Sequence, residues 1–142
     1  MKKRISLTGI FLLGLLTLNV AGNNAVAQEK DASGPKFEFK AENNRLDLDT
    51  IYVSKVEEVN LEIEFKNTGD KPLILSRVRA CCGTRVASYP EQPVKPGEAG
   101  VIEVSFRVVP RPHNINRSVT VASNDPGGQK VLRIRGRVER EE

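Results

Sequence analysis

The chain has 142 residues, a formal net charge of +4 and a sequence pI of about 9.2. This length favours a single domain, and a hydrophobic content of 39% supplies a core, which excludes wholesale disorder. Two cysteines are too few for a disulfide-dense mini-scaffold. The excess of basic over acidic residues favours binding to nucleic acid or to a membrane surface only if the basic residues lie together in the folded domain.

The N-terminus has the three-part layout of a secretory signal peptide over 1–27. A cationic start over 2–4 precedes an apolar run over 10–18, and small residues stand at Ala25 and Ala27. The run is shorter than the roughly 20 residues of a spanning helix, although an uncleaved N-terminal anchor is the alternative. We expect cleavage after Ala27, a periplasmic or secreted location, and no stable membrane span in the mature protein.

Cleavage changes the charge balance of the chain. It removes three of the 22 basic residues and none of the 18 acidic ones, which leaves a net charge of +1. Nucleic-acid binding normally rests on a basic excess that neutralises phosphates. We therefore expect no nucleic-acid partner.

Residues 28–35 read as a flexible lead-in, and 36–142 as one domain. Alternating apolar residues in this domain predict strands with one buried face. The continuous run Leu73-Ile74-Leu75 predicts a strand buried on both faces. The alternating sets are Phe37, Phe39 and Ala41; Leu46 and Leu48; Val59, Leu61, Ile63 and Phe65; Ile102, Val104, Phe106 and Val108; Val119 and Val121; Leu132, Ile134 and Val138.

Turn residues separate the predicted strands. Residues 67–72 predict a hairpin-type break, Lys95-Pro96-Gly97-Glu98 predicts a type II turn, and 124–128 is a further break. About seven short strands without an amphipathic helix predict an all-β fold, an antiparallel immunoglobulin-like β-sandwich. An open barrel is the alternative. The Cys…Trp…Cys signature of antibody domains is absent, so the likeness is architectural.

The two cysteines, Cys81 and Cys82, are adjacent, and three interpretations fit them. They pack as small apolar residues, they form a disulfide with each other or with another chain, or they make a soft-metal or redox site. A bridge between neighbours is strained, because Cα atoms about 3.8 Å apart lie below the relaxed range of roughly 4.4–6.8 Å. No Cys-x-x-Cys spacing supports a metal site.

His113 is the single histidine and follows Pro110-Arg111-Pro112, which predicts a solvated position in a loop between strands. The alternatives are contact with a metal or a partner and a thiol–imidazole pair with Cys82.

Arg133, Arg135 and Arg137 share one face of the last predicted strand. One interpretation is a solvated face, paired across to Glu62 and Glu64 or protecting an edge strand. The other is a contact surface for carboxylate or phosphate groups. No aromatic residue interleaves with them, so no base-stacking platform is predicted.

Several short motifs follow one another in a recognisable order: Asn-Thr-Gly-Asp-x-Pro-Leu over 67–73, Cys82-Gly83, Tyr89-Pro90 before Pro96-Gly97-Glu98, and Ser123-Asn124-Asp125. Together they resemble the bacterial family called domain of unknown function 1573, over most of residues 45–138. The resemblance implies a seven-stranded sandwich in an exported protein, similar to immunoglobulin-like domains of ciliary, centrosomal and major sperm protein types. It implies no established activity.

The chain departs from that family at the cysteines. The family usually reads Ser-Cys-Gly-Cys-Thr where this chain reads Cys81-Cys82-Gly83-Thr84. Cys82 and Gly83 match the first Cys and the Gly, Thr84 stands at the second Cys, and Cys81 replaces the Ser. A family site that uses the two cysteines therefore carries over only at Cys82.

The chain contains no G-x-S-x-G, H-E-x-x-H, P-loop or G-x-G-x-x-G motif. We therefore expect a non-enzymatic module without a cofactor. The predicted role is protein interaction or envelope structure, with another exported or envelope protein bound along an exposed strand edge. The alternatives are a thiol-based metal or redox site at Cys81-Cys82 and a hydrolase with an unrecognised site.

Overall fold

The computed structural model of this chain describes residues 33–54 and 58–142. The expected signal peptide and most of the expected lead-in lie outside the described residues. No helix in the described part is long and apolar enough to cross a membrane. The elements, in chain order, are β1 (Phe37–Phe39), the short 3₁₀ helix η1 (Glu42–Asn44), β2 (Arg45–Tyr52), β3 (Glu58–Asn67), β4 (Leu75–Ala80), β5 (Thr84–Ser88), β6 (Ala99–Arg107), β7 (His113–Ser123) and β8 (Lys130–Glu139).

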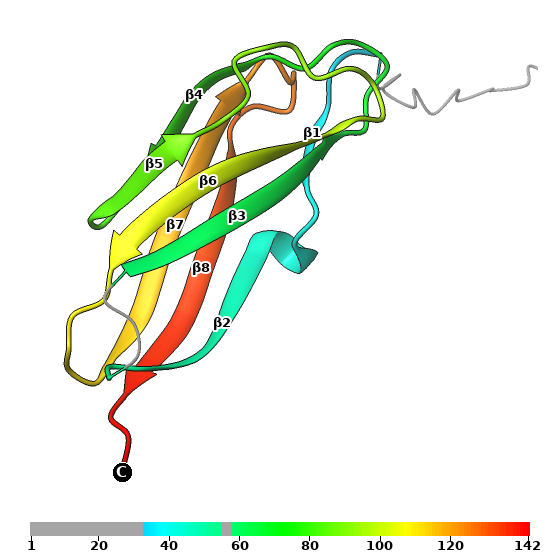
Figure 1. Cartoon of the computed structure of the whole chain (residues 1–142). Coiled ribbons are helices and arrows are strands. Elements are labelled where there is room, and N and C mark those ends of the chain that lie inside the picture. The colour runs from blue at the N-terminus through cyan, green and yellow to red at the C-terminus, as the bar shows by residue number, and fades with distance from the viewer. Residues whose placement is uncertain (1–32, 55–57) are drawn as a thin grey trace, which may run out of the picture.

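The strands form two four-stranded sheets that pack face to face (Figure 1). The first sheet has the order β1-β3-β6-β5 and the second the order β2-β8-β7-β4. This is an immunoglobulin-like sandwich in which the first strand of the fold is divided into two parts. β1 belongs to the first sheet and β2 to the second. The predicted all-β sandwich is confirmed, and the alternative of a barrel is wrong because the sheets are separate.

One pair of strands departs from the predicted antiparallel arrangement, because β2 runs parallel to β8. The cause lies in η1, where the chain crosses from the first sheet to the second. Asn43 and Asn44 have φ values of 52° and 54°, a left-handed conformation that asparagine tolerates better than most residues. β2 therefore enters the second sheet beside the last strand and in the same direction.

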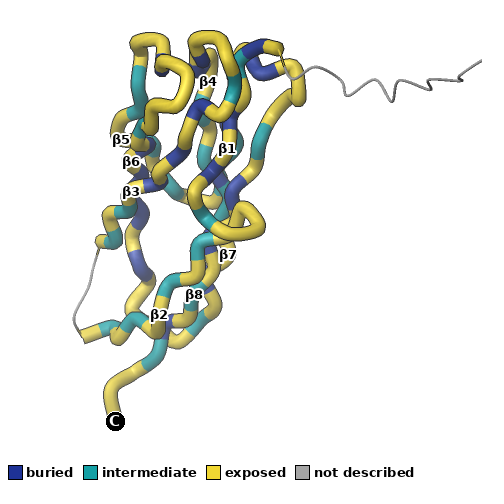
Figure 2. Tube along the Cα trace, turned by 90° about the vertical axis from the view of Figure 1, so that its right-hand side faces the viewer, coloured by how far each residue is buried: buried dark blue, intermediate teal, exposed yellow. Residues whose placement is uncertain are grey.

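The alternating apolar side chains meet between the sheets, where the buried positions of the chain trace lie (Figure 2). Phe37 stacks on Phe65 with ring centroids 4.7 Å apart, and Phe39 meets Phe37 edge-on at the same distance. Each such side chain contributes roughly 1.5–3 kcal/mol by leaving water. A smaller buried cluster of Phe106, Val108, Ile115 and Val138 continues the core.

Two local predictions between β3 and β4 are wrong. Residues 67–72 do not close a hairpin, because they lead from the first sheet to the second. Leu73 and Leu75 are buried, but Ile74 is 45% exposed, so the run is not buried on both faces. Leu73 instead forms an isolated bridge with Val94, with two N–H···O bonds of 2.8 Å.

The other two turn predictions fit the structure. Gly97 has a φ of 80°, and the N–H of Glu98 donates to the carbonyl of Lys95 at 3.0 Å, as a type II turn requires. Residues 124–128 connect the antiparallel strands β7 and β8, with Gly128 at a φ of 82°.

Candidate functional site

The two cysteines lie in a tight turn between the edge strands β4 and β5, which belong to different sheets (Figure 1). Cys82 and Gly83 have φ values of 63° and 75°, and the N–H of Thr84 donates to the carbonyl of Cys81 at 3.2 Å. Positive φ at both central positions is typical of a type I′ turn. We call residues 81–84 the cysteine turn; it presents Cys82 to solvent and keeps Cys81 half-buried.

The sulfur of Cys81 is surrounded by hydrogen-bond donors. It accepts from the N–H of Ser118 at 3.3 Å and from the hydroxyl of Ser118 at 3.2 Å. The thiol of Cys82 is in contact with this sulfur and acts as a third donor. Such donors stabilise a thiolate more than a thiol.

The two thiols therefore differ in acidity. The pKa of Cys81 is lowered, first by the hydrogen bond from Cys82, then by those from Ser118, with the positive charge of Arg117 adding to the effect. The pKa of Cys82 is raised, because its hydrogen bond to Cys81 keeps its own proton in place. When one thiol of the pair is ionised, it is that of Cys81.

A cationic hollow of about 460 Å³ adjoins the cysteine turn, and Cys82 and Gly83 form part of its wall. Arg85, Arg107 and Arg117 also line it, against a single carboxylate from Glu58. Arg117 lies with its guanidinium carbon 4.8 Å from the centre of the Phe106 ring, a cation–π contact. The hollow thus offers positive charge beside an exposed thiol.

In the described part of the chain, no group of three or more His, Cys, Asp or Glu side chains could hold a metal ion. The two cysteines therefore have no third side-chain ligand of these types beside them there. Both thiols are free in this structure, and the disulfide stays a prediction.

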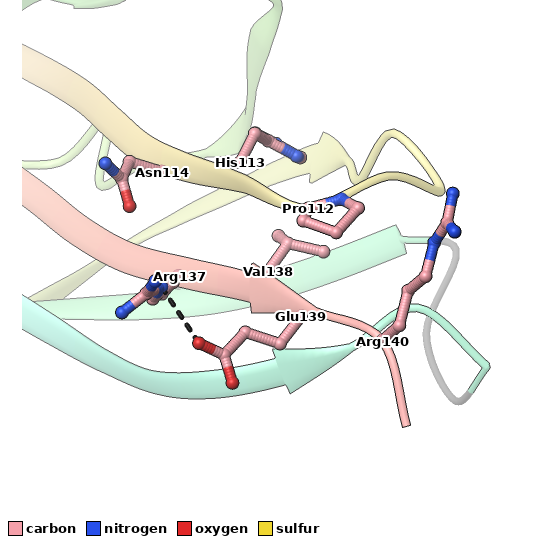
Figure 3. Close-up of a pocket in the computed structure, with 7 residues that line it drawn as sticks. All are labelled: Pro112, His113, Asn114, Arg137, Val138, Glu139 and Arg140. Carbon is pink, nitrogen blue, oxygen red and sulfur yellow. Dashed lines mark ion pairs between the residues drawn. The ribbon is translucent and has the colours of Figure 1, made fainter. Parts of the chain in front are cut away.

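His113 lies elsewhere, as the first residue of β7 rather than in a loop, which corrects the sequence-based expectation. Its Nδ1 lies 2.7 Å from the carbonyl oxygen of Arg111. Ser118, next to Cys81, is five residues further along β7, which is roughly 17 Å. The structure therefore does not bring His113 and Cys82 together. His113, Arg137 and Glu139 line one surface hollow, and Figure 3 shows the ion pair of Arg137 and Glu139 on β8, with the ring of His113 pointing away from it.

The three arginines Arg133, Arg135 and Arg137 lie on β8 with exposed side chains. Pairing with Glu62 and Glu64 is wrong, because β3 belongs to the other sheet. Edge protection is wrong too, since β8 lies between β2 and β7. The expectation of a shared outward face is confirmed by the alternation of buried and exposed residues along β8.

The sheet adds three further arginines to this surface. Arg45 on β2 pairs with Arg133, and Arg77 and Arg79 on β4 pair with Ala122 and Thr120 of β7. Paired residues point to the same side of a sheet. We call the resulting surface the arginine face; it comprises Arg45, Arg77, Arg79, Arg133, Arg135 and Arg137.

Two carboxylates on the same strands form ion pairs with residues of the arginine face, and Asp49 is a third exposed carboxylate on β2. Asp47 accepts from Arg45 at 2.7 Å, and Glu139 lies 2.9 Å from Nε of Arg137. Arg45 and Arg133 stand directly opposite each other, although like charges in this position are destabilising. The sequence already shows Arg77 and Arg79 alternating, but their place beside β7 depends on distant strand pairing.

Comparison with known protein families gives one match for this chain. Residues 39–138 match the family described as "Protein of unknown function (DUF1573)". The chain belongs to this family. The resemblance predicted from the motifs is thereby confirmed, and the family's description assigns no activity.

Two solved structures share the fold of this DUF1573 member. One is a protein of unknown function from Porphyromonas gingivalis W83, with a TM-score of 0.59 and 17% identity over 75% of this chain and 48% of that chain. The other is the secreted serine protease VesC from Vibrio cholerae, with a TM-score of 0.55 and 12% identity over 74% of this chain and 23% of that chain. This chain thus spans less than half of either structure, and identities this low show the fold alone. No curated protein matches the chain.

Proposed function

We propose that this DUF1573 protein is an exported, non-enzymatic β-sandwich module that binds another exported or envelope protein along β4. The observation that carries the proposal is that β4, an edge strand, presents Arg77 and Arg79 at alternate positions on the arginine face. An extended segment that pairs with β4 gains main-chain hydrogen bonds for affinity, and its side chains meet those arginines.

The choice of β4 rests on comparing the four edge strands. β1 has three residues, β5 is interrupted by a register shift, and β2 has a shift in its middle. The register shift of β4 lies at its start, between Leu75 and Arg77, and regular pairing follows as far as Ala80. β4 therefore offers a regular edge that carries two arginines, and the other arginines of the face lie on β8 and β2, beyond β7.

Charge selects the partner strand. Two copies of β4 facing each other bring arginines together, and such like charges deter edge-to-edge self-association. A strand with carboxylates at alternate positions meets Arg77 and Arg79 instead, because alternate residues on both strands are spaced by about 6.8 Å. Exclusion of one partner and attraction of another together give specificity.

Export rests on the signal-peptide pattern over 1–27. The family and the fold assign no catalytic activity, and the proposed role needs none. Another protein from the same compartment is the partner that such a module meets.

Binding to designed peptides tests this proposal on the mature protein, residues 28–142. We expect an eight-residue strand peptide with Glu at alternate positions to bind, and the same peptide with Lys in place of Glu not to bind, as measured by fluorescence anisotropy. The double variant Arg77→Glu/Arg79→Glu weakens binding by at least about tenfold, since each reversal replaces an attraction by a repulsion of roughly 1 kcal/mol.

The control is Lys95→Glu, a single reversal from basic to acidic charge in an exposed turn outside β4. We expect it to leave the affinity within about twofold, and added salt to weaken binding to the wild type. Equal binding of the Glu and Lys peptides, or an unchanged affinity in the double variant, contradicts the proposal.

A further inference from the structure

We propose that the cysteine turn is a thiol–disulfide exchange site, in which Cys81 attacks an anionic small-molecule disulfide and Cys82 then resolves the mixed disulfide. The product is a Cys81–Cys82 bridge and a reduced small molecule. This activity goes beyond the proposed binding function and does not depend on it.

The turn supplies the first requirement, which is two sulfurs in contact at an accessible place. The sulfurs of Cys81 and Cys82 are in contact, and the side chain of Cys82 is exposed. The exchange needs only these two sulfurs, whereas a structural zinc site takes four ligands, and no group of three or more His, Cys, Asp or Glu side chains gathers in the described residues. Thiol chemistry therefore fits the pair better than zinc binding does.

The surroundings give the two thiols different roles in the exchange. Ser118 donates two hydrogen bonds to the sulfur of Cys81 alone, whereas the positive charge of Arg117 acts on both thiols. These contacts favour the thiolate, which is the nucleophile in disulfide exchange. Cys82 has no such donors in the described structure and keeps its proton, so it acts second.

The neighbouring hollow selects the charge of the oxidant. Arg85, Arg107 and Arg117 line it together with Cys82, and Glu58 is the single carboxylate there. Arginine binds carboxylates through paired hydrogen bonds. A disulfide that carries carboxylates is therefore held beside the thiols, whereas a cationic disulfide is repelled.

The exchange balances in two steps. The Cys81 thiolate attacks one sulfur of R–S–S–R, the S–S bond breaks, and one RS⁻ leaves as Cys81–S–S–R forms. The Cys82 thiol gives its proton to that RS⁻, and the resulting Cys82 thiolate attacks the Cys81 sulfur and expels the second RS⁻, which takes a proton from water. Two protein thiols are oxidised and one disulfide is reduced. Because neighbouring Cα atoms lie only about 3.8 Å apart, the bridge is strained and easily reduced again.

Intact-mass spectrometry after reaction with glutathione disulfide, which is anionic, tests the assignment on residues 28–142. The wild type should lose two hydrogens and retain no adduct. Cys82→Ser, whose hydroxyl still donates to Cys81, should stop at one glutathione adduct on Cys81. Cys81→Ser should react at Cys82 at least about tenfold more slowly, because that thiol is less ionised.

Two controls test whether the folded structure causes the difference in rate between the two thiols and the preference for an anionic disulfide. Unfolding in urea should bring the rates of the two single variants together. Cystamine, a cationic disulfide, should react more slowly than glutathione disulfide with the folded wild type. Arg85→Gln should reduce this preference, whereas Arg140→Gln, an exposed change away from the hollow, should not.

Ser118 is a positioning residue in this scheme, and its test is a pH profile. In the Cys82→Ser background, Ser118→Ala should shift the alkylation of Cys81 by iodoacetamide to higher pH, because a donor to the thiolate is lost. Equal rates of the two single variants in the folded state, or disulfide-linked dimers as the wild-type product, overturn the proposal. A faster reaction with cystamine overturns the assigned charge of the oxidant.

Discussion

Thr84 is the residue of the cysteine turn whose side chain lacks a hydrogen bond within the described residues. Its Oγ1 is buried and has no hydrogen-bond partner in the described structure. A buried hydroxyl without a partner costs roughly 1–3 kcal/mol, because it loses its bonds to water and gains none. Thr84 also stands where the family motif usually has its second cysteine, so this chain holds a polar group in a site that suits a less polar side chain.

Replacing Thr84 by Val should stabilise the protein by about 1 kcal/mol, since valine keeps the shape and removes the unpaired hydroxyl. The urea midpoint of unfolding, followed at constant m-value, measures the change. Thr50→Val, at an exposed position of β2, is the matched control and should stay within about 0.5 kcal/mol. A loss of stability in Thr84→Val would show that the hydroxyl has a partner after all.

At the residue scale, sequence reasoning found the cysteines but not their surroundings. The adjacency of Cys81 and Cys82 is evident, whereas the contact with Ser118 depends on β4 pairing with β7. The contact between Cys81 and Ser118 joins residues 37 positions apart. Side-chain donors brought together over such a separation leave no local pattern in the sequence.

At the scale of elements, the crossover from β3 to β4 depends on one buried side chain. Asn67 is fully buried, and its Nδ2 donates to the carbonyls of Lys71 at 2.7 Å and Val94 at 2.9 Å. Its Oδ1 accepts from the N–H of Gly69 at 3.0 Å and, more weakly, from that of Lys36 at 3.3 Å. One amide thus satisfies backbone groups from three segments and sets where β4 begins.

Asn67→Ala should destabilise the protein by about 3 kcal/mol, because it leaves several buried backbone groups without partners. Thr68→Ala, at the exposed neighbouring residue, should cost no more than about 0.5 kcal/mol. Urea unfolding of both variants provides the measurement. A loss below about 1 kcal/mol for Asn67→Ala would show that water or backbone rearrangement replaces the amide.

Six of the eight strands were predictable, because alternation is a local signal of one buried face, whereas β5 and most of β4 lie outside the predicted sets. Val59 to Phe65 and Leu132 to Ile134 fall where the alternation places them. The assignment of strands to sheets was not predictable in the same way. The crossover after Asn67 has the composition of a hairpin turn, and η1 has that of any polar loop, so neither shows in advance that the chain changes sheet.

At the scale of the whole molecule, the outer faces of the two sheets differ in their balance of charge. The arginine face covers the second sheet, whereas the first sheet exposes five glutamates beside the basic residues Lys66, Arg85 and Arg107; the glutamates are Glu38, Glu58, Glu62, Glu64 and Glu103. Glu62 and Glu103 stand directly opposite each other, as Arg45 and Arg133 do on the other sheet. The described part of the chain therefore carries its strongest positive charge on the second sheet, and an acidic partner is attracted to that side.

Site-specific photo-cross-linking in cells tests the proposed partner binding most directly. A photoreactive residue is placed at Ser76, an exposed position of β4, and in a second variant at Lys95, in the exposed turn. We expect one discrete adduct with an exported protein at position 76, with this chain beginning at Gln28 and the partner linked through a segment with alternating acidic residues.

The same adduct should be lost in the Arg77→Glu/Arg79→Glu background and should not form at position 95. Equal adducts at both positions, an adduct that survives the double charge reversal, or no adduct at position 76 would contradict the account.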